Sequence, residues 1–304
     1  MIETSVIIPT KNGAQDIGVC LEAVFSQKGA GRVEVLVIDS GSTDSTLEIV
    51  RRYPVRLERI PPETFHHART RNHGASLAEG KFLVFLSQDA IPSSNAWLAA
   101  MLANFTDETV GAVYGKQLPK SGRNIERQYT LNVHYGDLKI VKDVKSREKL
   151  GYRYYFFSDA NSAIRKNVWQ VTGFPEELKI FEDIGIAKRI LESGKKIVYE
   201  PRACVYHSHD HTTTELFRRY FDYGVTLRRL GIWNREMRRS MMVEISAMVW
   251  KKLTEYEKGH KGKFGASVHQ DVAKTAGLLL GVSEWCLPKN LKRRFSGYGV
   301  FDLW

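Results

Sequence analysis

A short apolar run, residues 82–86 (FLVFL), is followed at once by the polar residues Ser87, Gln88 and Asp89. A run that is too short for a typical helix and rich in Phe, Val and Leu is typical of a strand buried on both faces of a parallel sheet. Ligands of open parallel sheets bind just beyond the carboxyl ends of the strands. We therefore expect Asp89 to lie at the centre of a ligand or metal site.

Further apolar runs predict strands at 4–9, 33–38, 55–60, 110–114, 195–199 and 203–206, with helical patterns between most of them. Strands that alternate with helices at this spacing indicate an α/β fold, Rossmann-like, with a mostly parallel sheet flanked by helices. Residues 115–150 show no clear period, and we interpret them as an insertion over the sheet or a lid. We place the end of this first domain, residues 1–212, near Thr212.

A basic helical extension is expected at residues 213–304. Residues 205–304 contain 17 Lys or Arg and 10 Asp or Glu, so they carry 7 of the 11 excess positive charges. Such a charge suits phosphates, an anionic membrane surface or nucleic acid, and it does not choose among them. Core packing, formation of a homodimer and membrane contact are all consistent with an apolar stripe in one of its helical patterns. The stripe comprises Met241, Met242, Ile245, Met248, Val249 and Trp250.

Cysteine usage and hydropathy narrow the class of protein further. The three cysteines are far apart and form no CxxC pair, which argues against a disulfide framework or a structural zinc site. The N-terminus lacks the basic and apolar regions of a signal peptide, and no apolar run approaches the roughly 18 residues that span a bilayer. We expect a cytoplasmic protein whose contact with a membrane, if any, is peripheral.

Polar residues follow the first two predicted strands and are candidates for binding a nucleoside. Pro9, Thr10 and Asn12 end the first strand, and Asp39 ends the second. The Asp39 carboxylate could accept hydrogen bonds from a base N–H or from ribose hydroxyls. Alternatively, Asp39 only caps the turn from strand to helix.

Three further groups of residues are candidates for diphosphate, metal and acid–base chemistry. Either Arg69 or Arg71, with Asn72 beside them, has the guanidinium geometry that suits a diphosphate, or both arginines are solvated surface residues. His207 and His209 follow the last strand at i and i+2; with Asp89 they would hold Mg²⁺ or Mn²⁺, or they form a surface turn. Glu182 and Asp183 open a helix, where the helix dipole stabilises carboxylates, or one of them takes a proton from an attacking hydroxyl.

Five short segments of the sequence, in the order given below, resemble the family 2 inverting glycosyltransferases of GT-A fold. They are residues 6–12 (VIIPTKN), 37–44 (VIDSGSTD), 68–74 (ARTRNHG), 85–90 (FLSQDA) and 181–183 (FED). Residues 64–72 (TFHHARTRN), 87–92 (SQDAIP) and 205–209 (VYHSH) are similar to the bacterial rhamnosyltransferases that use dTDP-L-rhamnose. The resemblance covers residues 4–210.

The resemblance implies a division of labour among the site residues. Residues 1–114 would bind the nucleotide-sugar and residues 115–212 the acceptor. Asp183 would be the catalytic base with Glu182 as second choice, and Asp89 would hold a divalent cation with His207 and His209. The nucleotide-sugar would contact Pro9, Thr10, Asn12, Asp39, Arg71, Asn72, Gln88 and Asp89. The acceptor would be a glycan or lipid-linked saccharide in the synthesis of a cell-surface polysaccharide such as O-antigen.

One residue departs from the family pattern, and two other functions stay open. Ser87 occupies the first acidic position of the family's DxD motif, which makes metal dependence less secure than the fold. A UDP-hexose-dependent glycosyltransferase of the same fold is the first alternative. A basic nucleic-acid-binding protein is the second; the pI of 9.5 suggests it, but no recognisable binding motif supports it, and we expect no nucleic-acid partner.

Overall fold

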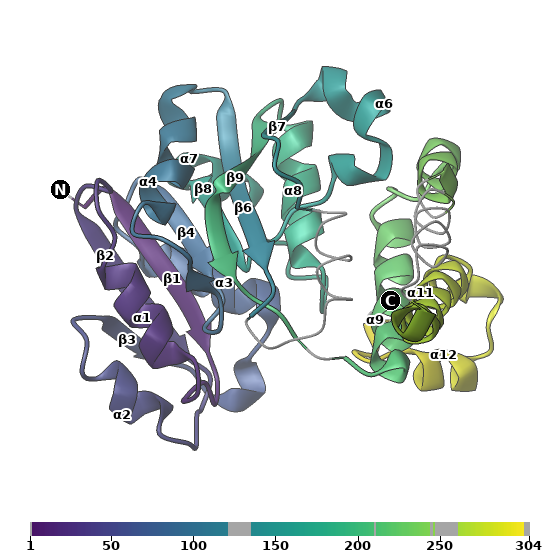
Figure 1. Cartoon of the computed structure of the whole chain (residues 1–304), viewed down its shortest axis with the longest axis horizontal. Coiled ribbons are helices and arrows are strands. Elements are labelled where there is room, and N and C mark those ends of the chain that lie inside the picture. Colours follow the sequence, from purple (N-terminus) through teal and green to yellow (C-terminus); the bar gives the residue numbers. More distant parts are fainter. Residues whose placement is uncertain (1, 121–134, 210, 244–245, 247–260, 301–304) are drawn as a thin grey trace. The chain divides into compact units, whose positions relative to one another are not determined.

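A computed structural model of the 304-residue chain describes residues 2–120, 135–209, 211–243, 246 and 261–300. The chain forms two compact units, which we describe separately. The sheet unit comprises residues 1–147, 155–176 and 182–208, and the helical unit comprises residues 148–154, 177–181 and 209–304. Figure 1 shows the strands gathered in the first and long helices in the second.

The described part of the sheet unit contains one nine-stranded sheet in the order β3-β2-β1-β4-β8-β6-β9-β5, with β7 paired to β9. Its strands are β1 (Thr4–Thr10), β2 (Val33–Asp39), β3 (Arg56–Arg59), β4 (Phe82–Leu86), β5 (Ile91–Pro92), β6 (Val110–Leu118), β7 (Ile140–Lys142), β8 (Asn161–Arg165) and β9 (Lys196–Tyr206). Strands β1 to β4 pair in parallel, as do β6 and β9, which confirms the predicted mostly parallel α/β sheet.

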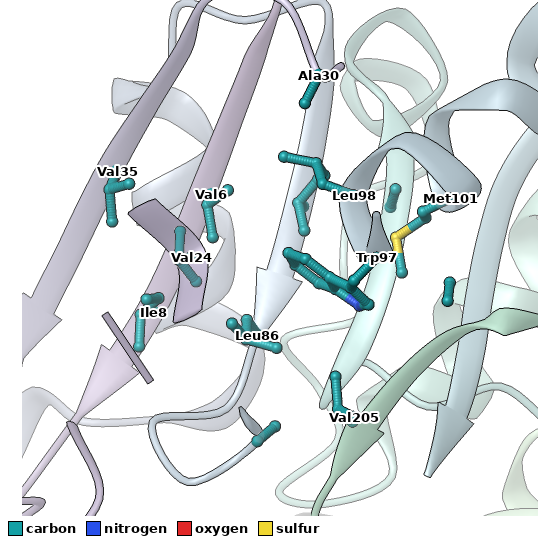
Figure 2. Packing of buried hydrophobic residues seen from close by; sticks show 14 of the residues in the cluster. Val6, Ile8, Val24, Ala30, Val35, Leu86, Trp97, Leu98, Met101 and Val205 are labelled. Atoms are coloured by element: carbon teal, nitrogen blue, oxygen red, sulfur yellow. The ribbon is translucent and has the colours of Figure 1, made fainter. Parts of the chain in front are cut away.

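Three helices cover one face of the sheet. They are α1 (Ile17–Phe25), α2 (Thr46–Val50) and α4 (Trp97–Leu102). Figure 2 shows Val24, Trp97, Leu98 and Met101 from these helices packed against Val6 and Ile8 of β1 and other strand residues. Successive residues of a strand point to opposite faces, so Val6 and Ile8 share this core while Ile7 faces away from it.

Helix α3 (His67–Leu77) packs closely against the other face of the sheet. A Cβ on Gly74 would lie only 2.6 Å from Ile7 Cγ2 and 3.3 Å from Ile38 Cγ1, so the helix can approach β1 and β2 this closely because residue 74 has no side chain. The remaining helices of this unit include α7 (Lys166–Thr172) and α8 (Glu182–Glu192), and α6 (Arg147–Leu150) begins at its boundary. The close packing of α3 brings Arg71, on the same helix, to the buried part of the unit.

Strand β8 was not predicted, and its direction shapes the site. It pairs antiparallel with both β4 and β6. Its amino end therefore lies at the same edge of the sheet as the carboxyl ends of β1, β2, β4, β6 and β9. Residues that precede β8 can consequently join residues that follow those strands.

Close helix packing characterises the helical unit, which includes α9 (Thr213–Arg229), α11 (Lys261–Val282) and α12 (Lys289–Phe295). A Cβ on Gly277 or Gly281 would fall within 2.3 Å of a backbone oxygen of α9, so both glycines permit this contact. Of the predicted apolar stripe, Met241 and Met242 lie in the helical residues 235–243, and the other four fall outside the described residues. No helix among the described residues is long and apolar enough to cross a membrane.

Candidate functional site

The turns that follow β1 and β2 are locked together by hydrogen bonds. The Asn12 backbone N–H donates to Ser42 Oγ at 2.8 Å, and Asn12 Oδ1 accepts from the Thr43 N–H at 2.8 Å. Asp39 is fully buried, and its carboxylate accepts from the N–H groups of Gly41 and Ser42, each at 3.1 Å. Asp39 would therefore help to bind a nucleoside indirectly, by fixing the conformation of the turn that follows β2.

The other predicted residues at these strand ends also lie at the carboxyl edge. Thr10 is buried, and its hydroxyl donates to the Ile8 carbonyl at 3.2 Å, whereas Pro9 is partly exposed. Gln88 joins the end of β4 to the end of β1, since its Oε1 accepts from Lys11 N at 3.0 Å and its Nε2 donates to Lys11 O at 3.1 Å. The structure thus brings these residues to one edge, as the strand pattern predicts.

Two non-glycine residues of the described chain have positive φ angles: one is a candidate site residue, and the other directly precedes one. Asn12 has φ = 47°, and Phe181, directly before Glu182, has φ = 63°. Left-handed backbone is uncommon for residues other than glycine and is costly for a bulky residue such as Phe. Strained backbone of this kind clusters at functional sites, so the two positions support a site at residues 10–12 and at 182–183.

Asp89 and His207 form a group that suits a divalent cation. His207 Nε2 lies 3.4 Å from Asp89 Oδ1, and one donor atom each from Asp89, His207 and His209 fall within 4.8 Å of one another. His207 Nδ1 lies 2.9 Å from Gln117 Oε1, and Gln117 Nε2 donates to Ser158 Oγ at 2.8 Å. Gln117 thus fixes the tautomer that leaves Nε2 to accept, which is the usual arrangement around a metal-binding histidine. The donor set fits Mn²⁺ or Mg²⁺, with nitrogen favouring Mn²⁺.

A second group consists of three acidic side chains around Arg71. Arg71 Nε lies 2.6 Å from Asp159 Oδ2, and Arg71 Nη1 lies 3.1 Å from Glu182 Oε1. Asp159, Glu182 and Arg71 are all buried, while Asp183, the next residue of α8, is partly exposed. The predicted residues Arg71, Glu182 and Asp183 therefore lie together, and Arg71 is an ion-pair partner of buried carboxyl groups.

Burial and mutual repulsion raise the pKa values of two of these acids. Burial raises the pKa of Asp159 to about 7, with a further increase from Glu182 and an opposing decrease from Arg71. Burial also raises the pKa of Asp183 well above its ordinary value, and the charges of Asp159 and Glu182 add to this. A carboxyl group with a raised pKa in a cleft is a candidate for general acid–base chemistry near neutral pH.

The amide of Asn72 is fully engaged by neighbouring groups of the protein. Its Nδ2 donates to Phe174 O at 2.9 Å and to Glu176 Oε1 at 3.0 Å. Its Oδ1 accepts from Trp169 Nε1 at 3.0 Å and from Phe174 N at 2.9 Å. The predicted contact between Asn72 and the sugar stays a prediction, and it would require one of these bonds to be exchanged.

Asp159 and Gln117 are site residues that the sequence reasoning missed, and Asp159 belongs to the acidic group. It precedes β8, whose polar residues Asn161 and Ser162 do not form an apolar run. The structure buries Asn161 completely and satisfies its amide with Trp97 Nε1 at 2.8 Å and the Ala203 carbonyl at 2.9 Å. An acidic residue beside a buried polar strand gives no signal in the hydropathy pattern.

Comparison with known sequences identifies related proteins over most of the sheet unit. The sequence model named "Glycosyl transferase family 2" matches residues 5–172. The O-antigen chain rhamnosyltransferase WbaN of Salmonella anatum is 39% identical over 194 residues, which are 63% of this chain and 62% of WbaN. The O-antigen chain rhamnosyltransferase RfbN of Salmonella typhimurium is 34% identical over 74% of this chain and 72% of its own length.

Comparison with solved structures supports the GT-A fold. The mannosyltransferase PcManGT of Pyrobaculum calidifontis, solved with GDP-Man and Mn²⁺, has a TM-score of 0.65 at 18% identity and covers 93% of this chain and 87% of its own. TarS 1–349 of S. aureus, solved with UDP-GlcNAc, has a TM-score of 0.57 at 21% identity, covering 75% of this chain and 66% of its own. At these identities, the likeness shows the fold alone.

Proposed function

Because this chain belongs to glycosyl transferase family 2, we propose that it transfers an L-rhamnosyl unit from dTDP-β-L-rhamnose to a hydroxyl of a glycan or lipid-linked saccharide. The product would enter a cell-surface polysaccharide of the O-antigen type. The similarity to WbaN and RfbN supports this choice of donor and pathway. The observation that carries the chemistry is a carboxyl group of raised pKa, Asp183, in the same unit as the Asp89–His207 pair.

Transfer would proceed by direct displacement with inversion. The acceptor hydroxyl oxygen bonds to the anomeric carbon while the bond from that carbon to the diphosphate oxygen breaks. The hydroxyl proton passes to Asp183, and dTDP leaves with the electron pair of the broken bond. Asp183 suits this step because its raised pKa makes it a stronger base than an ordinary carboxylate.

A divalent cation fits the donor set at the strand ends. Asp89 and His207 would hold it, with His209 as a third ligand. Such an ion, when bound, neutralises negative charge on a leaving diphosphate. The turns that carry Asn12, Asp39 and Gln88 would hold the nucleoside and keep it at the edge of the sheet.

We expect dTDP to bind more tightly than UDP, and Mn²⁺ to increase the affinity for dTDP at least about tenfold. Replacing Asp89 with asparagine or His207 with glutamine should remove this increase, since loss of a metal ligand or its partner typically costs ~10- to 100-fold in metal affinity. Isothermal titration with each nucleotide, with and without Mn²⁺, measures all four affinities. Glu48→Gln, which removes an exposed carboxylate from α2, is the matched control and should titrate as the unmodified protein does.

Each contrary result in this titration has a distinct meaning. Tighter binding of UDP would favour the UDP-hexose alternative and overturn the proposed donor. Binding of dTDP that does not respond to Mn²⁺ would mean that Ser87, in place of a carboxylate, marks a lost metal role. Binding of neither nucleotide would contradict the proposed function.

We also propose that the helical unit contacts an anionic membrane surface, where a lipid-linked acceptor would be found. Val272 and Leu279 are seven residues apart on α11, so they share one side of the helix, and both are exposed. Trp285, which follows α11, is 70% exposed. The basic residues Lys289, Arg293 and Arg294 of α12 are exposed as well. Exposed apolar and basic side chains in the same helical unit suit contact with an anionic bilayer surface.

We expect the protein to co-sediment with vesicles that contain phosphatidylglycerol and not with vesicles of phosphatidylcholine alone. The double variant Arg293→Glu/Arg294→Glu should bind at least about tenfold more weakly, because each basic residue near such a surface contributes ~1 kcal/mol. Trp285→Ser should also weaken binding, whereas Val171→Ser, an exposed valine of the sheet unit, should not. Unchanged vesicle binding in both helical-unit variants would contradict the contact, and a concentration-dependent change in mass would assign these side chains to a homodimer.

A further inference from the structure

The buried carboxyl groups beside Asp183 outnumber the positive charges that could balance them. Asp159 and Glu182 both lie against the Arg71 guanidinium, at 2.6 Å from Nε and 3.1 Å from Nη1. Two carboxylates on one guanidinium repel each other, and a single positive charge balances only one of them, so one of the two acids binds a proton more readily than an ordinary carboxylate does. Both groups are at most 7% exposed, which leaves little water to screen the repulsion. Asp159 and Glu182 are therefore an acid pair that shares one proton.

The charged and titratable groups around this pair come from four segments. Helix α3 supplies Arg71 and also His67, whose Nδ1 lies 3.8 Å from Glu182 Oε1. Asp159 comes from the residues before β8, and Asp183 follows Glu182 in α8. Tyr135, before β7, is also buried, and burial raises its pKa, with further increases from the charges of Asp183 and Asp159. With one proton shared, Arg71 balances the remaining charge of the pair, and Asp183 is left as the additional acid.

We propose that Asp159 is a positioning residue of the transfer site: with Glu182 it holds one proton and Arg71, and it thereby fixes the charge beside Asp183. The proposal rests on the proposed function of Asp183 as the base. Asp159 itself is buried and linked to Arg71 by two contacts, Nε to Oδ2 at 2.6 Å and Nη2 to Oδ1 at 3.3 Å, so it acts through its neighbours and not on the substrate.

Two consequences distinguish this role from simple support of the fold. First, when the shared proton is lost, both Asp159 and Glu182 are negative, and this second charge makes Asp183 a stronger base; Asp159→Asn cannot carry it, so the acidic limb of the rate profile moves to lower pH. Second, the folded protein binds more protons than the unfolded chain between about pH 4 and the raised pKa of Asp159, about 7. Stability therefore falls as pH rises through this window, and a protein without the Asp159 carboxyl keeps only the part of this loss that comes from Asp183.

The test compares Asp159→Asn with the unmodified protein and with Glu200→Gln, which alters a buried carboxylate of the same unit that is paired with Arg202. We expect Asp159→Asn to move the acidic limb of kcat downward by ~1 pH unit and to lower kcat at the optimum by up to ~10-fold. Thermal unfolding from about pH 4 to about pH 8 should show a decline in Tm that is smaller in Asp159→Asn and unchanged in Glu200→Gln.

A second variant keeps the test decisive if Asp159→Asn does not fold. Glu182→Gln removes the other member of the pair and should move the acidic limb in the same direction. A folded, active variant with reduced kcat and an unchanged acidic limb, together with an unchanged decline in Tm, would make Asp159 a structural residue only and overturn the proposal. Absence of transfer by the unmodified protein would instead contradict the proposed function, and the unfolding measurements, which need no activity, would still decide whether the acid pair exists.

Discussion

Replacing Asp183 with asparagine is expected to lower the rate of glycosyl transfer by about 10²- to 10⁴-fold, the usual contribution of a general base. An amide has almost the shape of the carboxylate but cannot take the acceptor proton. Affinity for the donor nucleotide should change little, because Asp183 is assigned to the acceptor hydroxyl and not to the diphosphate. The expected result is thus a loss in kcat with a nearly unchanged dissociation constant for dTDP.

Steady-state kinetics, nucleotide titration and thermal unfolding of the same preparation measure the three quantities. The matched control is Glu215→Gln, which removes a carboxylate from the first turn of α9, where it completes a capping box with Thr212. If a first-turn carboxylate mattered only through the helix dipole, the two variants would behave alike. We expect Glu215→Gln to retain the full rate. Retention of near wild-type transfer by a folded Asp183→Asn protein would exclude Asp183 as the base, and a larger loss in Glu182→Gln would transfer the role to Glu182.

The strands that carry Asp39 and Asp89 could be predicted because β2 and β4 are short apolar runs that end in polar residues. Both strands pair in parallel with β1, which places those ends at one edge, and there His207 Nε2, just after β9, lies 3.4 Å from Asp89 Oδ1. Hydropathy is sufficient for this part because both faces of the strands are buried. The structure adds that Gln88, which follows β4, bonds to Lys11 at the end of β1.

Helix α3 and strand β8 could not be predicted in this way. The side of α3 that faces the sheet presents Ala68, Gly74 and Ala75 with Arg71, so it lacks the large apolar residues that mark an amphipathic helix. Strand β8 buries Asn161, whose amide bonds replace apolar contacts. Small and polar residues become buried here because partners distant in the sequence satisfy them; Arg71, for example, pairs with Asp159, 88 residues away in the chain. The acid cluster joins both elements, so its geometry required the structure.

Arg71→Met is expected to destabilise the fold by about 3–5 kcal/mol, the usual result of removing one partner from a buried ion pair. The methionine would fill similar space but would leave Asp159 and Glu182 without the guanidinium that contacts both. Arg71→Lys should also be destabilising, because an ammonium group cannot reproduce the planar contacts to two carboxyl groups. The loss should be smaller at about pH 5 than at about pH 8, because protonation of the acids at low pH removes the charge that Arg71 balances.

Urea unfolding at both pH values measures this difference. Arg52→Met is the control, since Arg52 forms an exposed ion pair with Glu48 and should contribute little at either pH. A large, pH-dependent loss in Arg71→Met would mean that the arginine is held mainly by the acid cluster and that the predicted contact to the diphosphate-sugar is secondary. A small loss of stability combined with weaker binding of dTDP would instead make the contact to the diphosphate-sugar the main role of Arg71. In that case Arg71 would serve the ligand first, and the carboxyl groups around it would orient its side chain toward the diphosphate.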